Sequence, residues 1–448
     1  MPERNVLVAG AGAAGMIAAL AAAARGARVR LVERDLAAPS TLSVSGGLFA
    51  AAGTRWQAAA GVEDGPARFA EDVRAFTRGT AHPGVLATVV ANAGRAAEFL
   101  ADVAGLPIHL HVVGRWPGHS AARLHATPAE SGAELSALLR EAVPRQPRIV
   151  VEDGAELCAL TTDGAEVSRA GSRSLVAADA VVLATGGFGA DAALLAQHAP
   201  AAAAAVHVGG RHAAGTALRV AAPFTPAIAC MDSYQGQPHV SPHVVNGVRP
   251  RFGASLPALG AVLVNRDGVR FAPEDMGPSE LAARVLAQPG GIAVEIWDAA
   301  AQEAAMAGGP FRAATGLGVI ARCDDLASLA ARFALPEAAL RATLEEVARC
   351  ARGEAKDALG RARWGAPHVA PFFAAEVTGA LAHTQGGLVV DGAARVLRED
   401  GNVIPRLFAA GGAACGISGR GAAGYVPGNG LAQSFALGLL AGENAASG

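Results

Sequence analysis

The chain has 448 residues, of which 52% are hydrophobic, and a formal net charge of -2. This length allows two or three domains with a large buried core, and the dispersed, nearly balanced charge excludes an electrostatic footprint for nucleic acid or an anionic membrane. The five cysteines form no CxxC, CxxCH or metal-type spacing, so we expect reduced thiols, no metal, and no iron–sulfur or haem centre. No secretory leader or membrane-spanning run is recognisable, which favours a cytoplasmic protein without membrane insertion.

The first informative pattern is a glycine-rich turn between an apolar strand and an alanine-rich helix. It has the form GxGxxG, at Gly10, Gly12 and Gly15. The first glycine permits the tight turn, the second lets the backbone approach a pyrophosphate, and the third lets the helix pack on the strand. The next strand ends in Glu33, whose carboxylate would accept hydrogen bonds from a ribose. The order of these parts predicts a dinucleotide site at a helix N-terminus, and a purely structural crossover is the alternative.

The remaining elements follow in chain order from periodicity and turn residues. Around the first turn we expect strands at 5–9 and 28–33 and a helix at 16–24, then a β-meander at 148–151, 155–162, 166–170 and 173–177, and a buried strand at 180–184. A proline-rich stretch at 223–257 separates this part from a largely helical one, with helices at 279–288, 298–307, 325–333 and 336–351. The chain then returns to strands at 387–391 and 406–410, a glycine-rich loop at 411–430 and a closing helix at 431–444. This alternation is typical of an α/β fold.

Glycine turns follow apolar strands at three places: 10–15, 185–187 and 411–412. A nicotinamide cofactor normally needs only the first, whereas FAD enzymes of this fold return the end of the chain to the flavin. Here the sequence resembles the flavoprotein family of fumarate reductase, succinate dehydrogenase and 3-ketosteroid dehydrogenase. The matching segments are VLVAGAGAAG at 6–15, STLSVSGGLFAAA at 40–52, VVLATGGFG at 181–189, VLVNRDGVRFAPE at 262–274, HTQGGLVVD at 383–391 and RLFAAGGAACGISG at 406–419.

The resemblance implies a Rossmann-like FAD-binding domain, a parallel sheet with a β-meander, and an inserted α+β capping domain. We expect the FAD-binding domain at 1–230 and 371–448, and the capping domain at 231–370. Covalently flavinylated relatives attach the flavin through a histidine, and its position here is Ser40, so we expect noncovalent FAD. The residues expected to contact FAD are Gly10, Gly12, Ala13, Ala14, Gly15, Glu33, Arg34, Thr41, Ser45, Gly46, Gly47, Ala184, Thr185, Gly186, Gly387, Gly411, Gly412, Gly428, Asn429, Gly430 and Leu431.

Departures from the dicarboxylate-reducing relatives concern the substrate site. Those relatives use two arginines and two histidines to hold the substrate and deliver a proton. Local alignment keeps one histidine as His383 and replaces the other by Gln237. The two arginine positions become Pro278 and Tyr425. Proline cannot transfer a proton and tyrosine cannot neutralise a carboxylate as a bidentate arginine does, so fumarate reduction is not expected.

The segment from Tyr425 to Leu431 instead resembles the tyrosine-proline-glycine loop of ketosteroid dehydrogenases. This implies α,β-dehydrogenation of a carbonyl-containing small molecule, in which Tyr425 stabilises the enolate oxygen and either Tyr234 or His383 takes a proton. Gln237, Arg420 and His125 are expected at the substrate, and the charge of Arg420 keeps an acid substrate open. His239 and His243 are expected at surface or hinge positions.

Two other functions stay open from the sequence. One is an ene-reductase that runs in the reverse direction, and the other is a non-catalytic flavin-binding electron-transfer subunit. Because no second redox centre is expected in the chain, an enzyme of either direction needs an external electron acceptor or donor.

Overall fold

The computed structural model describes residues 3–112, 116–253 and 256–447, and the chain divides into two compact units. Unit 1 comprises Met1–Ala203, His207–Gln235 and Ala382–Gly448, and unit 2 comprises Ala204–Val206 and Gly236–Leu381. The sequence placed the inserted segment at 231–370. Its role as a cap over a flavin stays a prediction.

Unit 1 is built on a six-stranded sheet in the order β19-β20-β10-β1-β2-β6. The strands are β1 (Asn5–Ala9), β2 (Arg28–Glu33), β6 (Ile149–Asp153), β10 (Ala180–Leu183), β19 (Arg395–Leu397) and β20 (Val403–Ala409). All neighbours pair in parallel except β19, which runs antiparallel to β20. The near-continuous burial of β1 and β10 agrees with parallel strands covered on both faces.

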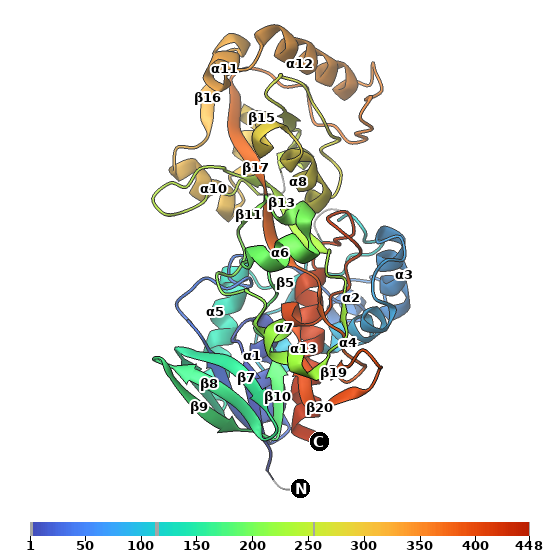
Figure 1. Ribbon diagram of the computed structural model, residues 1–448. Coiled ribbons are helices and arrows are strands. Elements are labelled where there is room, and N and C mark those ends of the chain that lie inside the picture. The colour runs from blue at the N-terminus through green and yellow to red at the C-terminus, as the bar shows by residue number, and fades with distance from the viewer. Residues whose placement is uncertain (1–2, 113–115, 254–255, 448) are drawn as a thin grey trace. The chain divides into compact units, whose positions relative to one another are not determined.

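Two glycine-containing helices pack closely in unit 1 (Figure 1): α1 (Ala13–Ala24) and α13 (Asn429–Ser447). A Cβ atom at Gly438 would lie 2.4 Å from Ile17 Cγ2, and one at Gly442 would lie 2.2 Å from the Ala18 carbonyl oxygen. Since neither position has room for a side chain, these glycines set the close approach of the last helix to the first. Helix α13 is thereby held along α1, the helix that follows the first glycine turn.

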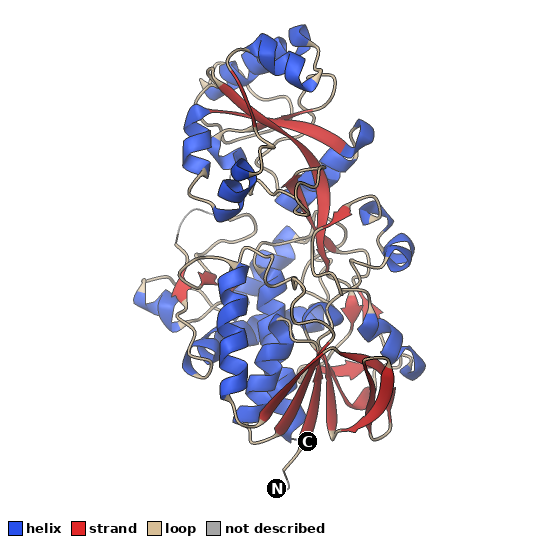
Figure 2. Ribbon diagram, turned by 90° about the vertical axis from the view of Figure 1, so that its left-hand side faces the viewer, coloured by secondary structure: helices blue, strands red, loops and turns tan. Residues whose placement is uncertain are grey.

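The β-meander expected from the sequence has three strands, not four. They are β7 (Ala155–Thr161), β8 (Gly164–Arg169) and β9 (Ser172–Ala177), paired antiparallel. The segment expected as its first strand forms β6, which pairs in parallel with β2 and therefore belongs to the main sheet. Figure 2 shows the strands of the chain in red and its helices in blue. The other elements of unit 1 are α2 (Arg55–Ala59), α3 (Pro66–Phe76), α4 (Pro83–Asp102), α5 (Gly132–Ala142), α6 (Ala192–His198), α7 (Thr216–Ala221), β3 (Phe49–Ala50), β4 (His109–Leu110), β5 (Leu124–Ala126), β12 (Ile228–Ala229) and β18 (Gly387–Leu388).

Unit 2 combines a sheet with five α-helices in the described ranges. Its longest strand, β17 (Phe372–Thr384), pairs with β15 (Ile292–Asp298), and β15 pairs with β14 (Val262–Val264). Strands β13 (Tyr234–Val240), β16 (Ala321–Cys323) and β11 (Val206–His207) also pair with β17. The helices are α8 (Pro278–Leu286), α9 (Ala299–Ala305), α10 (Gly309–Gly316), α11 (Leu326–Phe333) and α12 (Glu337–Ala351). The mixed α/β fold expected from the sequence is confirmed.

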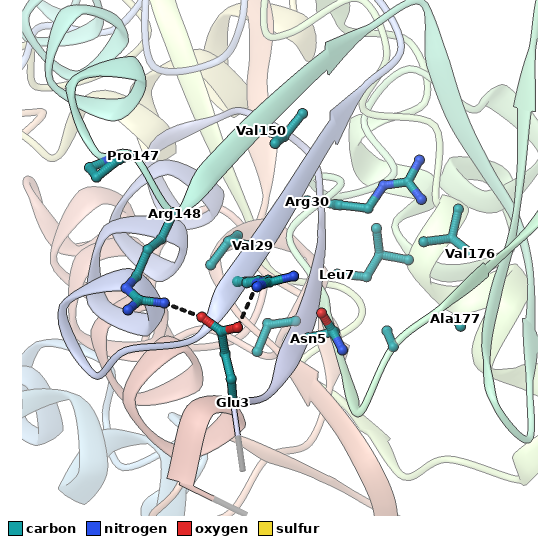
Figure 3. A pocket seen from close by; sticks show the side chains of 13 residues that line it. Glu3, Asn5, Leu7, Val29, Arg30, Pro147, Arg148, Val150, Val176 and Ala177 are labelled. Carbon is teal, nitrogen blue, oxygen red and sulfur yellow. Dashed lines mark hydrogen bonds and ion pairs between the residues drawn. The ribbon is translucent and has the colours of Figure 1, made fainter.

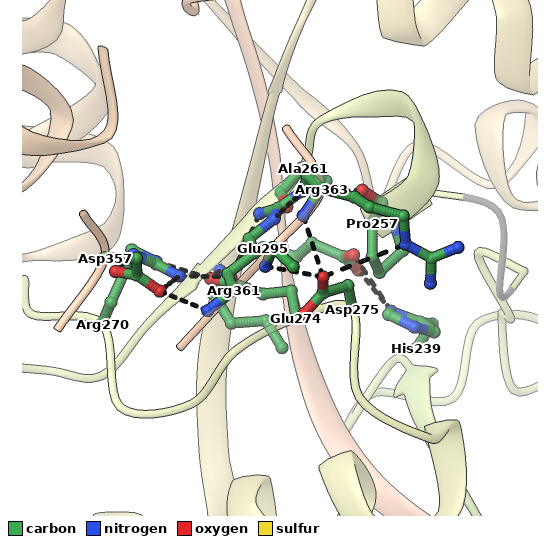
Figure 4. A network of polar contacts seen from close by, with 12 residues as sticks. His239, Pro257, Ala261, Arg270, Glu274, Asp275, Glu295, Asp357, Arg361 and Arg363 are labelled. Atoms are coloured by element: carbon green, nitrogen blue, oxygen red, sulfur yellow. Dashed lines mark hydrogen bonds and ion pairs between the residues drawn. The ribbon is translucent and has the colours of Figure 1, made fainter. Parts of the chain in front are cut away.

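Unit 2 contains a buried network of ion pairs (Figure 4). Glu274 accepts hydrogen bonds from Arg270 at 2.6 Å and from Arg361 at 3.0 Å. Nearby, His239 lies 3.0 Å from a carboxylate oxygen of Glu295, and both side chains are buried. The expectation of a surface position for His239 is therefore wrong, because strand β13 carries it into the interior of unit 2, and the alternative of a hinge position stays a prediction. His243 contacts Glu376 at 2.7 Å and is mostly exposed.

In the ranges that the structure describes, no helix is both long enough and apolar enough to span a lipid bilayer.

Candidate functional site

The three glycine turns meet in unit 1, at the carboxyl ends of β1, β10 and β20. A Cβ atom at Gly10 would lie 2.3 Å from the Ala184 carbonyl oxygen, and one at Gly412 would lie 2.6 Å from the Gly187 nitrogen. Gly10 also has φ +105°, a conformation that favours glycine. The turns thus form one surface at the sheet edge where open α/β folds bind ligands.

A pocket of about 530 Å³ lies at the opposite edge of the same sheet (Figure 3). Its lining includes Asn5 and Arg28, which begin β1 and β2, and its charged rim is joined by ion pairs of Glu3 with Arg28 (2.6 Å) and with Arg148. Because ligands of such sheets bind at the carboxyl ends of the strands, we do not assign this pocket to the candidate site.

The first turn has the geometry of a phosphate site. Gly12 directly precedes α1, and a Cβ atom there would meet nothing within 4 Å. At Gly15, in contrast, a Cβ atom would lie 1.7 Å from the Gly10 carbonyl oxygen, so the helix packs directly on the turn. Glu33 Oε2 accepts a hydrogen bond from the Ala11 nitrogen at 2.7 Å. The turn therefore leaves open space at a helix N-terminus, with a carboxylate beside it.

The loop at 40–47 is held by its own side chains. Ser45 Oγ donates to the Leu42 carbonyl at 2.7 Å, and Thr41 Oγ1 accepts from the Gly210 nitrogen at 3.0 Å. Gly47 has φ +73°, whereas a Cβ atom at Gly46 would meet nothing within 4 Å. With these hydroxyls engaged inside the protein, the loop offers a ligand its backbone at Gly46.

Two buried polar side chains near the glycine turns have no hydrogen-bond partner among the described residues. The Asn429 side chain, in the first turn of α13, is fully buried with both its amide oxygen and its amide nitrogen unpaired. Thr185 Oγ1, just after β10, is also buried and unpaired. Since buried polar groups normally find partners, these atoms indicate a polar ligand on this surface.

His383 and Tyr425 meet beside the start of α13. Their ring centroids are 5.7 Å apart in an edge-to-face arrangement. The Thr384 carbonyl oxygen lies 3.3 Å from His383 Nδ1, and Gln385 Nε2 lies 3.1 Å from the same nitrogen. A Cβ atom at Gly430 would lie 3.0 Å from His383 Nε2, so only glycine lets α13 begin this close to the imidazole.

Burial keeps both of these side chains uncharged near neutral pH. It lowers the pKa of His383 to about 4. Burial also raises the pKa of Tyr425 above its usual value of 10, although hydrogen bonds from the Gly430 and Gly428 backbone oppose the rise. A neutral imidazole has one nitrogen free to accept a proton, and a neutral phenol can donate a hydrogen bond.

The other expected site residues, Arg420, Tyr234 and His125, are paired or buried inside unit 1. Arg420 Nε donates to Asp232 Oδ2 at 2.9 Å, so its charge is paired. Tyr234 is buried, which raises its pKa, and its backbone nitrogen donates to Gly421 O at 3.4 Å. The His125 ring contacts Thr54 Oγ1 through one nitrogen and the Arg123 carbonyl through the other. We therefore do not include His125 in the proposed substrate site.

Arg34 is largely exposed and contacts Glu156 at 3.2 Å. Gln237 and Pro278 belong to unit 2, where Pro278 is the first residue of α8. Sequence reasoning did not identify Gln385 and Asp232 as partners of His383 and Arg420, because these contacts exist only in the folded chain.

Comparison with known proteins places this chain in a family. The FAD binding domain family matches residues 5–431. The probable fumarate reductase Ifc3 of Shewanella frigidimarina (strain NCIMB 400) is 28% identical over 455 residues, which cover 99% of this chain and 74% of that protein. The 4-oxocyclohexanecarboxylate 2-dehydrogenase of Sinomonas cyclohexanicum is 26% identical over 556 residues, 99% of this chain and 92% of that protein. The solved structure of the open conformation of a flavocytochrome c3 fumarate reductase superposes with a TM-score of 0.84 at 27% identity, covering 99% of this chain and 78% of that one.

The chain belongs to the FAD binding domain family. It is an FAD-dependent oxidoreductase of the dehydrogenase and reductase class, whose named members act on CH–CH or C=C bonds. The resemblance stated from the sequence motifs is thereby confirmed, and so is FAD as the cofactor.

The residues of unit 1 fit FAD. Open space at Gly12 suits a pyrophosphate at the N-terminus of α1, and the unpaired Asn429 amide can both donate to and accept from a polar ring. The individual contacts to FAD stay predictions.

Proposed function

We propose that this chain oxidises a CH–CH bond next to a carbonyl group, and that it takes carbonyl compounds in preference to dicarboxylates. The observation that carries this proposal is the pair of uncharged side chains, His383 and Tyr425, beside the start of α13. A neutral phenol suits a carbonyl oxygen, and an unprotonated imidazole suits the removal of a proton.

The structure does not support a pair of arginines that would bind the carboxylates of a dicarboxylate substrate. Tyr425 and Pro278 stand where the resemblance calls for arginines, and Arg420 is neutralised by Asp232. A buried carboxylate without a matching cation costs several kcal/mol in desolvation. A dicarboxylate such as fumarate would need two such cations, whereas a ketone needs only hydrogen-bond donors.

Tyr425 supplies the donor for the carbonyl oxygen. Its phenol oxygen accepts hydrogen bonds from the backbone around Gly428 and Gly430, which orients the hydroxyl and strengthens the hydrogen bond that it donates. As the α-proton leaves, negative charge grows on the carbonyl oxygen and this hydrogen bond becomes stronger. Tyr425 therefore acts mainly in the transition state.

His383 takes the α-proton. We assign its own ring proton to Nδ1, which donates toward the Thr384 carbonyl, and this leaves the lone pair on Nε2. We also assign the Gln385 side-chain amide in the orientation flipped by 180°, which exchanges the positions of its oxygen and nitrogen. Its oxygen then accepts a hydrogen bond from the same Nδ1–H. The flip also moves the amide oxygen away from Gly416, toward which the side-chain oxygens of Gln385 and Gln433 otherwise both point. With its pKa lowered to about 4, His383 is neutral at pH 7, so its Nε2 lone pair is free to accept a proton, although the low pKa also makes the imidazole a weaker base.

The glycine turns, Glu33 and Asn429 would hold FAD, which would supply the hydride acceptor when bound. The electrons then pass to an external acceptor. Tyr234, whose pKa burial raises, is less suited than His383 to act as the base, because a phenol must first lose its own proton, whereas a neutral imidazole already has a free lone pair.

The test is anaerobic bleaching of the bound flavin by a matched pair of saturated compounds, a cyclic ketone and the same ketone bearing a ring carboxylate, with succinate as the control. We expect bleaching by both ketones at rates within about tenfold of each other, the factor that corresponds to about 1.4 kcal/mol, and none by succinate. Bleaching by succinate, or by the keto acid alone, would contradict the proposal.

The reverse reaction is tested on the reduced protein. Reoxidation by an unsaturated ketone, without bleaching by the saturated one, would favour an ene-reductase. No response to any compound in either direction would favour the non-catalytic flavin-binding subunit.

A further inference from the structure

One face of the main sheet of unit 1 carries arginines where apolar side chains are the rule. Strand β2 lies between β1 and β6, and parallel strands in such a position normally read as continuous apolar runs, because both faces of the sheet are covered. β2 instead alternates, with Arg28 and Arg30 exposed and Val29 and Leu31 buried. Both arginines line the pocket of about 530 Å³ at the edge of the sheet opposite to the glycine turns. A central strand therefore places two charges beside an open cavity.

The strand register extends this face across three strands. Leu7 of β1 pairs with Arg30 of β2, which pairs with Val150 of β6, and all three residues line the pocket together with Val176 of the meander. Val150 is 57% exposed, so an apolar side chain of the sheet is left open to solvent. Figure 3 shows Arg30, Leu7 and Val176 on the same side of the pocket. The pocket thus joins apolar walls to a basic rim.

A resident carboxylate shows what the rim can bind. Glu3, which precedes β1, pairs with Arg28 at 2.6 Å and also with Arg148, and Figure 3 shows both contacts. The side chain of Glu3 is 36% exposed, and those of the two arginines are more exposed still. Ion pairs this exposed are weak. A ligand carboxylate can therefore take the place of Glu3 between the two guanidinium groups.

Arg30 is paired differently from the other two arginines. Its Nε donates to Glu152 Oε1 at 2.8 Å, and its Nη2 lies 2.7 Å from the same oxygen. Glu152 does not line the pocket, so it neutralises Arg30 without occupying the cavity. A guanidinium held at its edge keeps its flat faces free, and arginine faces stack on aromatic rings. With Leu7 and Val150 beside it, Arg30 suits the apolar ring of a ligand.

We propose that this pocket binds a small aromatic monocarboxylate. The carboxylate displaces Glu3 and accepts hydrogen bonds from Arg28 and Arg148, while the ring lies against Arg30 and the apolar walls. The pocket volume falls in the range of small-molecule sites, about 300 to 1,000 Å³. Because the glycine turns lie at the other edge of the sheet, this site is independent of the proposed function.

The test is isothermal titration calorimetry of the FAD-loaded protein with 2-naphthoate, and with the uncharged 2-naphthamide as the matched probe. We expect naphthoate to bind at least about tenfold more tightly, because only the carboxylate forms charge-assisted hydrogen bonds with the arginines. The flavin absorption spectrum should stay unchanged as the site fills. Equal affinities of the two probes, or a flavin spectrum that changes in step with the calorimetric titration, would overturn the proposal.

The other occupant of this face could be a second copy of the chain. Absence of naphthoate binding, together with dimerisation that depends on protein concentration, would assign the face to that contact and overturn the proposal. Absence of binding by a protein that stays monomeric would overturn it as well.

Two changes of charge should move the affinity for naphthoate in opposite directions. Glu3→Gln removes the competing carboxylate, so we expect binding about threefold tighter or more. Arg148→Gln removes a donor to the ligand, so we expect binding about tenfold weaker. Arg173→Gln is the control, because Arg173 is an exposed arginine of β9 that does not line the pocket, and it should bind as the parent does.

Unchanged affinity in both Glu3→Gln and Arg148→Gln, or weaker binding in Glu3→Gln, would show that the rim does not recognise the carboxylate. The substituted side chains are partly exposed, so we expect all three variants to fold. Should one of them fail to fold, the comparison of the two probes on the parent protein still decides the proposal.

Discussion

At the scale of single residues, the phenol of Tyr425 can donate one hydrogen bond. Its oxygen is engaged by backbone N–H groups at the start of α13, and its ring is fixed edge-to-face against His383. Burial raises its pKa, so the phenol does not compete with His383 as a base. In the proposed reaction, Tyr425 would polarise the carbonyl group and His383 would receive the proton.

We predict that Tyr425→Phe keeps the fold and the flavin spectrum but loses most of the rate of flavin reduction by substrate. Removal of one donor to a developing oxyanion costs about 3 kcal/mol, or a factor on the order of 100 to 1000. Anaerobic stopped-flow measurement of flavin bleaching checks this, with Tyr234→Phe as the control that should lose much less. A Tyr425→Phe rate within about threefold of the parent, far from the expected loss, would leave this tyrosine a packing role only.

At the scale of elements, the first turn separates ligand binding from folding. Gly12 has φ -83°, which suits any residue, and faces open space, whereas a side chain at Gly15 would collide with the backbone of Gly10. We predict that Gly12→Leu folds but retains little FAD, because the side chain fills the space for the pyrophosphate. Gly15→Ala should fail to fold into a stable protein. Circular dichroism and the flavin-to-protein absorbance ratio check both, and full flavin occupancy in Gly12→Leu would show that the pyrophosphate lies elsewhere.

Sequence reasoning succeeds for elements whose signal is local. The strand, turn and helix around Gly10 follow directly from apolar periodicity and glycine spacing. It missed β17, the 13-residue strand of unit 2, and helix α4 of unit 1, and it assigned β6 to the meander because a strand's partner is a tertiary choice. In the candidate site, motif resemblance identified His383 and Tyr425. The pairing of Arg420 with Asp232 depends on long-range packing that no spacing encodes.

At the scale of the whole molecule, FAD should be held by noncovalent contacts alone. Ser40, where a histidine would form the flavin link, exchanges hydrogen bonds with Ser43 at 2.9 and 3.1 Å. We predict that acid precipitation leaves all the flavin in the supernatant and a colourless pellet. Flavin that stays with the pellet through denaturing washes would reveal a covalent link elsewhere in the chain.

Three buried histidines should make the folded chain less stable in acid. Burial lowers the pKa of His119, His125 and His383 to about 4 each, against an ordinary value of 6.5. Between these two values the unfolded chain binds protons at the three positions and the folded chain does not. The free energy of unfolding must therefore fall as the pH falls from 6.5 toward 4, and each histidine contributes up to about 1.4 kcal/mol per pH unit in this window.

Urea unfolding of the FAD-loaded protein at pH 7, 6 and 5 checks this prediction, at values where most carboxylates remain ionised. We expect stability to fall at each step. His125→Gln should make the free energy of unfolding depend less on pH, because the slope against pH measures the protons taken up on unfolding. The variant can also be less stable than the parent at pH 7, because it loses the contacts of His125 with Thr54 and Arg123. Equal stability at pH 7 and pH 5 would mean that these histidines are protonated as readily in the folded chain as in the unfolded one, and a charged His383 near neutral pH would remove the argument for its role as a base.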